Sequence, residues 1–477
     1  MSHNLDPPGT LVLDKLKAIV GAGGWKLGSE PTRHFTDPRG RFKGKACLIL
    51  LPGSTEQVAE IVLQCNSAKI GIVPFSGGSG VVAGQLSIDS DHCIVLSLEK
   101  MNKVRDISIE DGVIVVEAGC ILENIHNAAH KHELMFPLSM ASKGSCCIGG
   151  NLATNAGGIQ VIRHGNARDL CLGIEAVLPN GSVYSELSPL RKNNTGYDLR
   201  NLLIGSEGTL GIITAATLIV KPIDPETATA LCAVESPAHA LMVFKQLRKD
   251  MGDNITALEL MSKFGLELVT KHFTSLQLPF SLNQKWFLLV EVAGHEGIGN
   301  RFEQALSKCH ENDLIADATI AHSKTQQTNL WDLRENTPEA NRISGAICSS
   351  DTAVPISKVD AFIEHTTSAI REIHADLRLN TYGHIGDGNI HHNVLPPEGH
   401  GKTTFINENP GIVELARMAI NDATVKFEGS ISAEHGIGRL KVRDLECYSD
   451  GTKLAAIRSI KKALDPNGIM NPGAVIA

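Results

Sequence analysis

The chain has 477 residues, of which 42% are hydrophobic and 20% charged, and it carries a formal net charge of −8 at pH 7. This length exceeds what one hydrophobic core usually supports, so two or three domains are expected. The composition is that of a globular protein and excludes a predominantly disordered one. The negative charge argues against a general affinity for nucleic acid or anionic lipid, so a small acidic ligand would need a local basic pocket.

The start of the chain, MSHNLDPPGTLVLDKLKAIVGAGG, has neither the basic residues nor the long apolar run of a signal peptide. No later stretch reaches the roughly 18 apolar residues of a membrane span. We therefore expect a cytoplasmic protein, peripheral to a membrane at most, or a mitochondrial matrix protein if the source is eukaryotic. The eleven cysteines are scattered without a CxxC pair, so they are predicted to be core residues in a reducing compartment.

The first half of the chain alternates predicted strands and helices. Residues 47–51 read as a strand, and the following helix begins at Ser54, which forms a capping box with Gln57. Another strand, residues 70–75, runs into a glycine-rich loop. Further elements are strands at 94–98 and 113–119, a helix at 122–132, and strands near 174–179 and 211–220.

A proline-rich connection, VKPIDPET at residues 220–227, predicts a domain boundary. Beyond it, residues 285–294 read as a strand, and residues 330–342 and 361–373 read as helices. The last hundred residues are dense in His, Gly and Asn. The predicted division is an N-terminal segment, 1–40, a first domain, 41–222, and a second domain, 223–477.

The loop FSGGSGVVAG, residues 75–84, follows a strand directly, as phosphate-binding loops do. Its GxGxxA pattern (Gly78, Gly80, Ala83) and Glu99 about 20 residues later resemble a nicotinamide-type fingerprint. However, residues 81–92 are too broken by glycine and serine to form the helix that such a site needs. A tight surface turn is the other reading of this loop alone.

Two further glycine clusters, GSCCIGGNLATNAGG at 144–158 and IGSEGTLGIIT at 204–214, favour a ligand. Three such loops in one domain suit a long dinucleotide that lies across several of them. In order and spacing, the three loops resemble the vanillyl-alcohol-oxidase (PCMH-type) FAD-binding domain. The resemblance implies an α+β fold, in which a two-subdomain FAD-binding domain is followed by an α+β substrate domain with an antiparallel sheet.

The same resemblance assigns cofactor contacts by position, with no strong indication of a covalently attached flavin. The first loop would bind the pyrophosphate, the second cluster the flavin ring and ribityl chain, and the third the adenine side. The implied residues are Pro74, Ser76, Gly77, Gly78, Ser79 and Gly80; Gly144, Ile148, Gly149, Asn151, Ala153 and Thr154; and Glu207, Gly208, Gly211 and Ile212.

The segment NTYGHIGDGNIHHNV places His384 and His391 on either side of a glycine–aspartate turn. If the arms are extended, His391 and Asn393 share one face and His392 lies on the other. Glu434 and His435 follow about 40 residues later. Two imidazoles and a carboxylate would suit zinc or a similar divalent ion, although a hydrogen-bonded polar loop would look the same.

The strings GHIGDGNIH, SAEHGIG and ALDPNGIMNPG resemble the C-terminal domain of the D-lactate and D-2-hydroxyglutarate dehydrogenase group. With the flavin half, the resemblance covers about 420 residues. It implies the following roles: His384, His391 and Glu434 as ligands of zinc, manganese or iron, His435 as general base, Arg334 as the grip on the substrate carboxylate, and Asn393 and Asn471 as groups near substrate and flavin.

These residue types fit the oxidation of a D-2-hydroxy acid, which loses a proton and a hydride from one carbinol centre. An arginine fork suits a carboxylate, although Arg334 could also be an ordinary surface arginine. The sequence departs from the hydroxyglutarate pattern, because Pro338 stands in place of a threonine and Ser349 in place of a lysine. This weakens the case for a second, distal carboxylate on the substrate.

The predicted function is thus an FAD-dependent, metal-assisted D-2-hydroxy-acid dehydrogenase. No fused iron–sulfur module is visible, so the flavin would pass electrons to a separate acceptor, such as an electron-transfer flavoprotein, a quinone or a cytochrome. A homodimer is the expected assembly. The alternatives are a non-redox alkyl transferase of the same flavin fold, which needs an apolar membrane-docking surface, and a flavin-binding electron-transfer module without its own substrate.

Overall fold

A computed structural model describes residues 5–30, 32–87 and 92–476. By contacts the chain forms two compact units. Unit 1 comprises residues up to 158, 165–223 and 434–477, and unit 2 comprises 159–164 and 224–433. The sequence predicts a domain boundary between residues 222 and 223. In the structure, residues 434–477 belong to unit 1. None of the helices within the described ranges has the length and apolar character that crossing a membrane requires.

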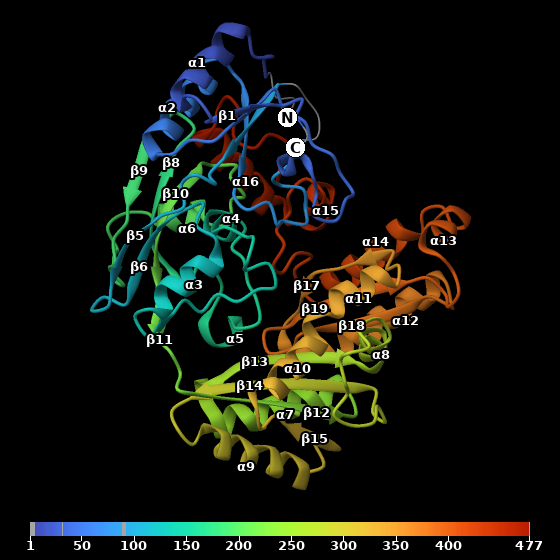
Figure 1. The fold of residues 1–477 in the computed structure, drawn as a ribbon. Coiled ribbons are helices and arrows are strands. Elements are labelled where there is room, and N and C mark those ends of the chain that lie inside the picture. The colour runs from blue at the N-terminus through green and yellow to red at the C-terminus, as the bar shows by residue number, and fades with distance from the viewer. Residues whose placement is uncertain (1–4, 31, 88–91, 477) are drawn as a thin grey trace. The chain divides into compact units, whose positions relative to one another are not determined.

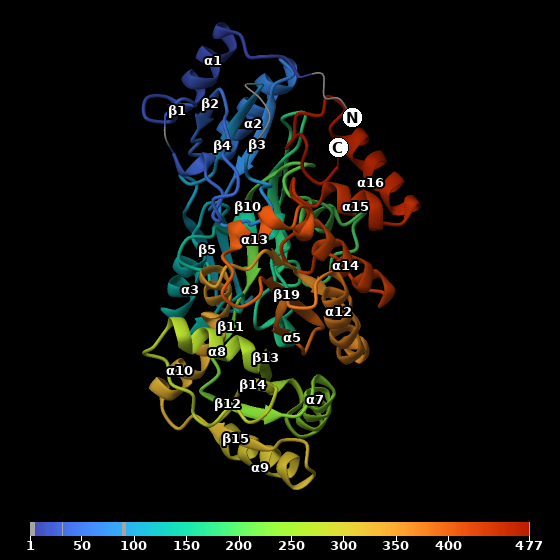
Figure 2. The same cartoon turned by 90° about the vertical axis from the view of Figure 1, so that its right-hand side faces the viewer.

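The first sheet of unit 1 has the order β1-β2-β4-β3, with β2, β4 and β3 parallel. Helices α1 and α2 pack on it through a shared apolar core (Figure 2). The elements are β1 (Trp25–Leu27), β2 (Leu48–Leu50), β3 (Gly71–Phe75), β4 (Cys93–Ser97), α1 (Thr10–Val20) and α2 (Thr55–Ser67). The predicted start of α2 is confirmed, because the Ser54 side chain accepts a hydrogen bond from the Gln57 amide.

The second sheet of unit 1 is antiparallel, with the order β5-β6-β10-β8-β9. Its strands are β5 (Val104–Ser108), β6 (Val113–Glu117), β8 (Cys171–Val177), β9 (Val183–Glu186) and β10 (Ile212–Ile219), and β7 (Leu134–Met135) pairs with β11 (Lys221–Pro222). The helices of the remainder of unit 1 are α3 (Leu122–His130), α4 (Ile148–Ala153), α6 (Leu199–Leu203), α15 (Val442–Tyr448) and α16 (Gly451–Leu464). Residues 81–87 contain no helix, as expected, and residues 88–91 of the same segment lie outside the described residues.

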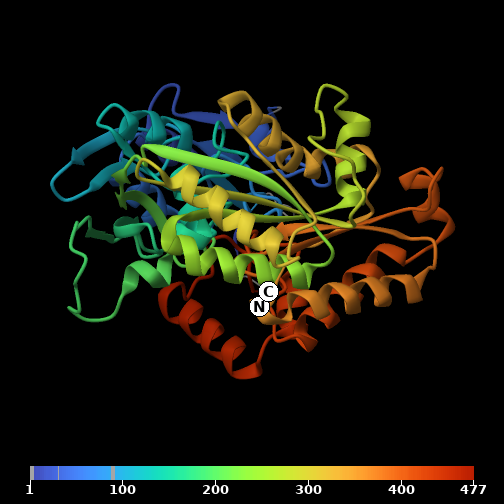
Figure 3. The ribbon, with the colours of Figure 1, turned by 90° about the horizontal axis from the view of Figure 1, so that it is seen from below.

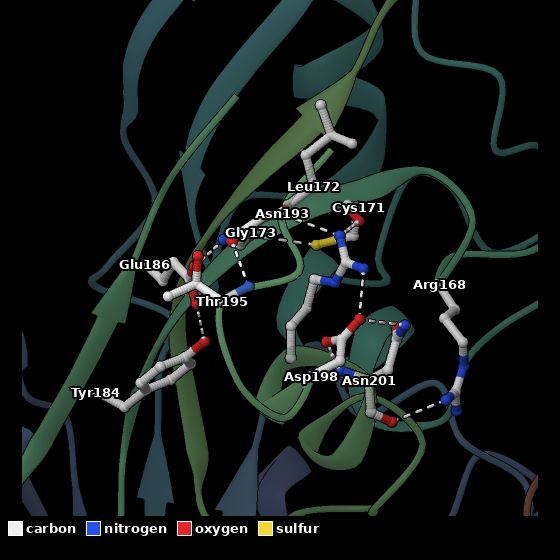
Figure 4. A network of polar contacts seen from close by, with 11 residues as sticks. Arg168, Cys171, Leu172, Gly173, Tyr184, Glu186, Asn193, Thr195, Asp198 and Asn201 are labelled. Carbon is white, nitrogen blue, oxygen red and sulfur yellow. Dashed lines mark hydrogen bonds and ion pairs between the residues drawn. The ribbon is translucent and has the colours of Figure 1, made fainter. Parts of the chain in front are cut away.

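Polar contacts fix the chain between β9 and the third glycine cluster (Figure 4). Asp198 caps α6 by accepting a hydrogen bond from the Asn201 amide at 2.9 Å. The Arg168 guanidinium donates to the carbonyls of Asn201 and Ile204 at 2.8 and 2.9 Å. Ile204 begins the third cluster, so these contacts hold that loop at its start.

Unit 2 is built on one antiparallel sheet with the order β15-β12-β14-β13-β18-β19-β16, and β17 also pairs with β19 (Figure 1). The strands are β12 (Glu226–Val234), β13 (Ile255–Ser262), β14 (Trp286–Gly294), β15 (Asp317–Ile320), β16 (Cys348–Ser349), β17 (Thr352–Ala353), β18 (Arg378–His384) and β19 (Asn389–Leu395). The predicted α+β architecture with an antiparallel sheet in the second half is confirmed.

Helices cover both faces of this sheet because its strands are apolar on both sides. Ala230 and Cys232 face the core formed with α7, α9 and α12, whereas Leu231 and Ala233 face α8, α10 and α11. Figure 3 shows α7 in green and α9 in yellow side by side on one face. The helices are α5 (Val161–His164), α7 (Pro237–Met251), α8 (Lys263–His272), α9 (Ile298–Glu311), α10 (Lys324–Glu335), α11 (Thr337–Ile343), α12 (Val359–Ile373), α13 (Lys402–Glu408) and α14 (Ile412–Lys426).

The single helix predicted at 330–342 is wrong, because the structure has two helices there, α10 and α11. They meet at Asn336, and Pro338 stands in the first turn of α11. Proline cannot donate the backbone hydrogen bond of a helix interior but fits a first turn, so it ends one helix and begins the next.

The C-terminal segment of unit 1 is fastened by the buried ammonium of Lys461. Its Nζ contacts Asp465 Oδ2 at 2.5 Å and donates to the carbonyls of Thr209 and Met470, both at 2.7 Å. Thr209 belongs to the third glycine cluster. Residues 469–471 in turn bond to Ile72 of β3. The end of the chain is therefore bonded to the third glycine cluster and to the strand that leads into the first glycine loop.

We expect Lys461→Met to lower the free energy of unfolding by about 3–5 kcal/mol, because it leaves the buried Asp465 carboxylate without its cation. Urea unfolding followed by circular dichroism measures this change. The adjacent, exposed Lys462→Met is the control and should stay within about 0.5 kcal/mol of the parent protein. Equal stability of the two variants would contradict the role given to the Lys461 ammonium.

Candidate active site

Three neighbouring strands of unit 2 bring polar side chains to one face of the sheet. Glu259 of β13 lies opposite His384 of β18, and Tyr382 lies opposite His391 of β19. Cross-strand partners share a face, and side chains two residues apart on a strand return to it. Asn393 therefore joins the same face. The predicted arrangement of His391 and Asn393 is confirmed, and His384 folds back beside His391, with ring centroids 5.6 Å apart.

His392 points to the opposite face, as its position in the alternation predicts. Its ring lies 5.3 Å from that of Phe362, between centroids, and its Nδ1 lies 2.9 Å from the Thr381 hydroxyl. Complete burial lowers the pKa of His392 to about 3, so the ring stays neutral. It is a core histidine rather than a part of the polar face.

The centre of the polar face is a carboxylate that has no solvent exposure. Glu259 Oε1 lies 2.5 Å from His384 Nδ1, and Glu259 Oε2 accepts a hydrogen bond from Arg334 Nε at 2.7 Å. Burial alone would raise the pKa of this carboxyl, but the charges of His384 and Arg334 outweigh it and hold the pKa at about 2. The Arg334 guanidinium also lies 4.7 Å from the centre of the Tyr382 ring.

The contacts of Glu259 orient the His384 imidazole beside that of His391, so that the two rings can bind one metal ion. Because Glu259 contacts Nδ1 of His384, a metal bound to this ring would bind Nε2. A ring nitrogen of His384 and one of His391 lie within 4.8 Å of each other, and His391 Nδ1 lies 4.0 Å from Asp351 Oδ1. The nitrogen donors and the carboxylate behind them fit a divalent ion of the zinc type.

Glu434 and His435 begin the last segment of unit 1. Glu434 is joined by a peptide bond to Ala433, whose amide donates to the carbonyl of Asp351 at 3.2 Å. Consecutive residues have Cα atoms about 3.8 Å apart, so the backbone of Glu434 begins directly after the hydrogen-bonded residue Ala433. The resemblance gives Glu434 and His435 the roles of ligand and base, and both roles stay predictions.

The three glycine clusters of unit 1 converge. Gly77 has φ +82°, and a Cβ there would lie 2.6 Å from the Cys147 amide nitrogen, so the first loop and the second cluster touch through backbone. A Cβ at Gly208 would lie 2.9 Å from Pro74 Cγ, and the Glu207 amide donates to the Ala153 carbonyl at 2.8 Å. The third cluster thus meets both of the others.

The converged loops fit a dinucleotide. The glycines allow the three loops to meet closely, which suits a long ligand that lies across all three. Asn151, predicted to line the flavin, has a buried Oδ1 with no hydrogen-bond partner among the described residues. A buried acceptor without a partner is costly, which a ligand donor such as a flavin N–H would relieve. Ser76 Oγ, by contrast, donates to the Ala118 carbonyl at 2.9 Å.

Two predicted cofactor residues form hydrogen bonds with protein groups. The Glu207 carboxylate accepts hydrogen bonds from the amides of Ile437 and Gly438, and the Asn471 side chain donates to the carbonyls of Gly84 and Glu207. Burial raises the pKa of Glu207, and the two amides oppose that rise. The cofactor contact of each residue stays a prediction.

Sequence reasoning missed Glu259, which holds His384 and Arg334 together. The strand ITALELMS, residues 255–262, was not identified, although a lone glutamate between Leu258 and Leu260 in an apolar run indicates a buried, partnered carboxylate. Arg439 was also missed. It follows the SAEHGIG string and donates to the carbonyls of Ala83 and Gly84.

Two family models match the chain. The model described as "FAD binding domain" matches residues 46–185, and the model described as "FAD linked oxidases, C-terminal domain" matches residues 223–475. Together they cover the glycine clusters of unit 1 and the polar face of unit 2. The chain is accordingly an FAD-dependent oxidoreductase by class.

Curated relatives match almost end to end. A D-2-hydroxyglutarate dehydrogenase of Xanthomonas citri pv. viticola is 36% identical over 452 residues, covering 94% of this chain and 93% of the relative. The mitochondrial D-2-hydroxyglutarate dehydrogenase of Arabidopsis thaliana is 34% identical, covering 92% and 77%. The D-2-hydroxyglutarate–pyruvate transhydrogenase DLD3 of Saccharomyces cerevisiae is 31% identical, covering 91% and 87%. The chain belongs to the FAD-linked oxidases, in the D-lactate and D-2-hydroxyglutarate dehydrogenase group.

Solved structures share the fold at lower identity. An alkyldihydroxyacetonephosphate synthase has a TM-score of 0.72 at 18% identity, covering 99% of this chain and 86% of that one. A p-cresol methylhydroxylase with bound substrate has a TM-score of 0.72 at 16% identity, covering 98% and 96%. These structures confirm the predicted PCMH-type fold, and the family models and curated relatives confirm the predicted family and enzyme class.

We expect Glu259→Gln to weaken the affinity for a divalent ion by about 10–100-fold, because it removes the carboxylate that orients His384. Zinc titration of the chelator-stripped protein measures this change. Glu291→Gln is the matched control: Glu291 lies on the adjacent strand β14 and accepts a hydrogen bond from Trp331 Nε1 at 2.7 Å. Equal zinc affinity of the two variants would refute the orienting role of Glu259.

Proposed function

We propose that this protein oxidises a D-2-hydroxy acid to the 2-oxo acid, with FAD as hydride acceptor and a divalent ion held by His384, His391 and Glu434. The observation that carries the proposal is the buried Glu259 carboxylate, which orients an imidazole beside a second imidazole and an arginine. Such carboxylate–histidine pairs are typical of metal sites. Zinc is the proposed ion, with manganese or iron as the other candidates.

When bound, the metal supplies a Lewis acid that acidifies the substrate hydroxyl, and the flavin supplies a hydride acceptor. His435 accepts the hydroxyl proton on an imidazole nitrogen as general base. Arg334 binds the substrate carboxylate. Its orientation is fixed by the hydrogen bond from Nε to Glu259 and by the ring of Tyr382.

Asn393 binds a substrate oxygen. Its side chain is buried, and its Nδ2 has no hydrogen-bond partner among the described residues. A buried donor left unpaired costs about 1–3 kcal/mol, so a substrate acceptor at this position would be favoured. This supports the assignment of Asn393 to the substrate rather than to the protein core.

The substrate class is a D-2-hydroxy acid, and D-2-hydroxyglutarate and D-lactate are its two leading members. Relatives over 30% identical are named for D-2-hydroxyglutarate. Ser349, in place of the lysine of the hydroxyglutarate pattern, is exposed and lies opposite Asn393 on the neighbouring strand. A serine hydroxyl binds a distal carboxylate less strongly than an ammonium does.

The electron acceptor is a separate molecule: an electron-transfer flavoprotein, a quinone or a cytochrome. The name of the yeast transhydrogenase adds a second 2-oxo acid as a candidate. We propose a cytoplasmic location, or the mitochondrial matrix if the chain is eukaryotic, since the plant relative is mitochondrial. A homodimer is the proposed assembly.

The two alternatives have less support. Similarity to the alkyldihydroxyacetonephosphate synthase at 18% identity concerns the fold alone. An electron-transfer module without its own substrate does not require the buried group of Glu259, Arg334 and His384 on the sheet of unit 2. The polar face of unit 2 therefore favours the dehydrogenase.

We expect anaerobic bleaching of the bound flavin by D-2-hydroxy acids and not by their L-enantiomers. Polar groups at fixed positions would bind the carboxylate and hydroxyl of only one enantiomer with its carbinol hydrogen toward the flavin. Absorbance near the flavin maximum follows the reduction with D- and L-lactate and D- and L-2-hydroxyglutarate. Chelation should abolish the bleaching, and zinc or manganese should restore it. Bleaching that survives complete metal removal would contradict the metal-assisted reaction.

His435→Ala should slow flavin reduction by about 100-fold or more, because the substrate proton then has no positioned acceptor. Stopped-flow absorbance at saturating substrate measures the rate, and the absorption spectrum measures flavin content. The exposed His322→Ala is the control and should leave the rate unchanged. Parallel loss of rate and of flavin in His435→Ala would assign this histidine a structural role.

A further inference from the structure

The Glu207 side chain of unit 1 was predicted to contact the adenine side of the cofactor, and it binds two backbone amides of the C-terminal segment. Its backbone has φ +52°, a left-handed conformation that is unfavourable for a residue with a Cβ. Oε1 accepts a hydrogen bond from the Ile437 amide at 2.7 Å, and Oε2 accepts one from the Gly438 amide at 2.8 Å. Both carboxylate oxygens thus bind the backbone just beyond His435.

The segment beyond His435 is shaped to receive this carboxylate. Gly436 has φ +76°, and a Cβ there would lie 2.7 Å from Glu207 Oε1. Gly438 has φ +51°, and a Cβ there would lie 2.1 Å from the Val82 carbonyl oxygen. Only glycine permits both the conformation and the close approach. The turn is therefore pressed directly against Glu207 on one side and the first glycine loop on the other.

Arg439 closes the arrangement. Its guanidinium donates to the Gly84 carbonyl at 2.7 Å and to Asn471 Oδ1 at 2.8 Å. Asn471 Nδ2 then donates to the Glu207 carbonyl at 2.8 Å, which returns the network to its start. Residues 436–439 are thereby held at both ends by groups of unit 1.

We propose that Glu207 is a positioning residue, which aims the His435 imidazole by holding the amides of Ile437 and Gly438. This rests on the proposed function, in which His435 takes the substrate proton. Two fixed amides and the Gly436 turn define the direction of the backbone that leaves His435, and hence the direction of its side chain. Glu207 contributes to the reaction through His435 and not through the cofactor.

The variant Glu207→Gln tests this with little change in size. A glutamine offers one acceptor and one NH2 group, so a donor would face a backbone N–H donor and the turn would shift. We expect the rate of substrate-driven flavin reduction at saturating substrate to fall about 10–100-fold, with KM little changed. Flavin content and the rate of reduction by dithionite, which needs no base, should match the parent protein.

The matched control is Glu186→Gln in the same unit. Glu186 on β9 contacts Tyr184 and Asn193, neither of which belongs to a glycine cluster (Figure 4). This variant should keep the parent rate. If Glu207→Gln does not fold, Glu207→Asp replaces it, because aspartate keeps both acceptors on a side chain one methylene shorter.

A double-mutant cycle with His435→Ala distinguishes the positioning role of Glu207 from the role of His435 as general base. If Glu207 acts through His435, the Glu207 substitution lowers the rate less than twofold further in a His435→Ala background. An equal penalty in both backgrounds, or loss of flavin from the Glu207 variant, would overturn the positioning role. If His435→Ala alone leaves the rate unchanged, the proposed function fails instead.

Discussion

The buried contact of Glu259 with His384 and Arg334 is the interaction on which the rest of the site depends. Removing a carboxylate, an imidazole and a guanidinium from water is costly, and the cost is offset only when all three are present and aligned. The register of β13 and β18 supplies that alignment, because it sets Glu259 opposite His384. One carboxylate thereby fixes which nitrogen of His384 faces outward and how Arg334 is turned, so the proposed metal ligand and the proposed substrate-binding arginine are oriented before anything binds.

In unit 1, the glycine clusters are fixed by other interactions than a buried carboxylate on a sheet. These clusters meet where glycines allow a close approach, and the C-terminal segment bonds to them. Lys461 bonds to the third cluster, and Arg439 bonds to the first loop. Loops that must bind a cofactor are hard to fix by apolar packing, since their surface has to stay open. Charged side chains that bond to loop carbonyls fix them instead, which explains why residues 434–477 belong to unit 1.

Local features of the fold were predictable from the sequence, and long-range ones were not. The Ser54 N-cap of α2 and the alternation that separates His391 from His392 follow from rules that span a few residues. Pro338 split a predicted helix because periodicity alone does not locate a proline-induced break. Glu259 was missed because its strand was not identified, and its partner His384 lies 125 residues away. Glu207 and Ile437 are 230 residues apart, and no local rule relates them.

Anomalous diffraction from crystals of the zinc-loaded protein, recorded at the zinc edge, tests whether Glu259 orients His384 toward a metal. We expect a single strong peak about 2.0–2.1 Å from Nε2 of His384, with His391 as a second ligand and Nδ1 of His384 still bonded to Glu259. A peak on a different group of residues, or a His384 ring that binds zinc through Nδ1 with Glu259 turned away, would contradict it.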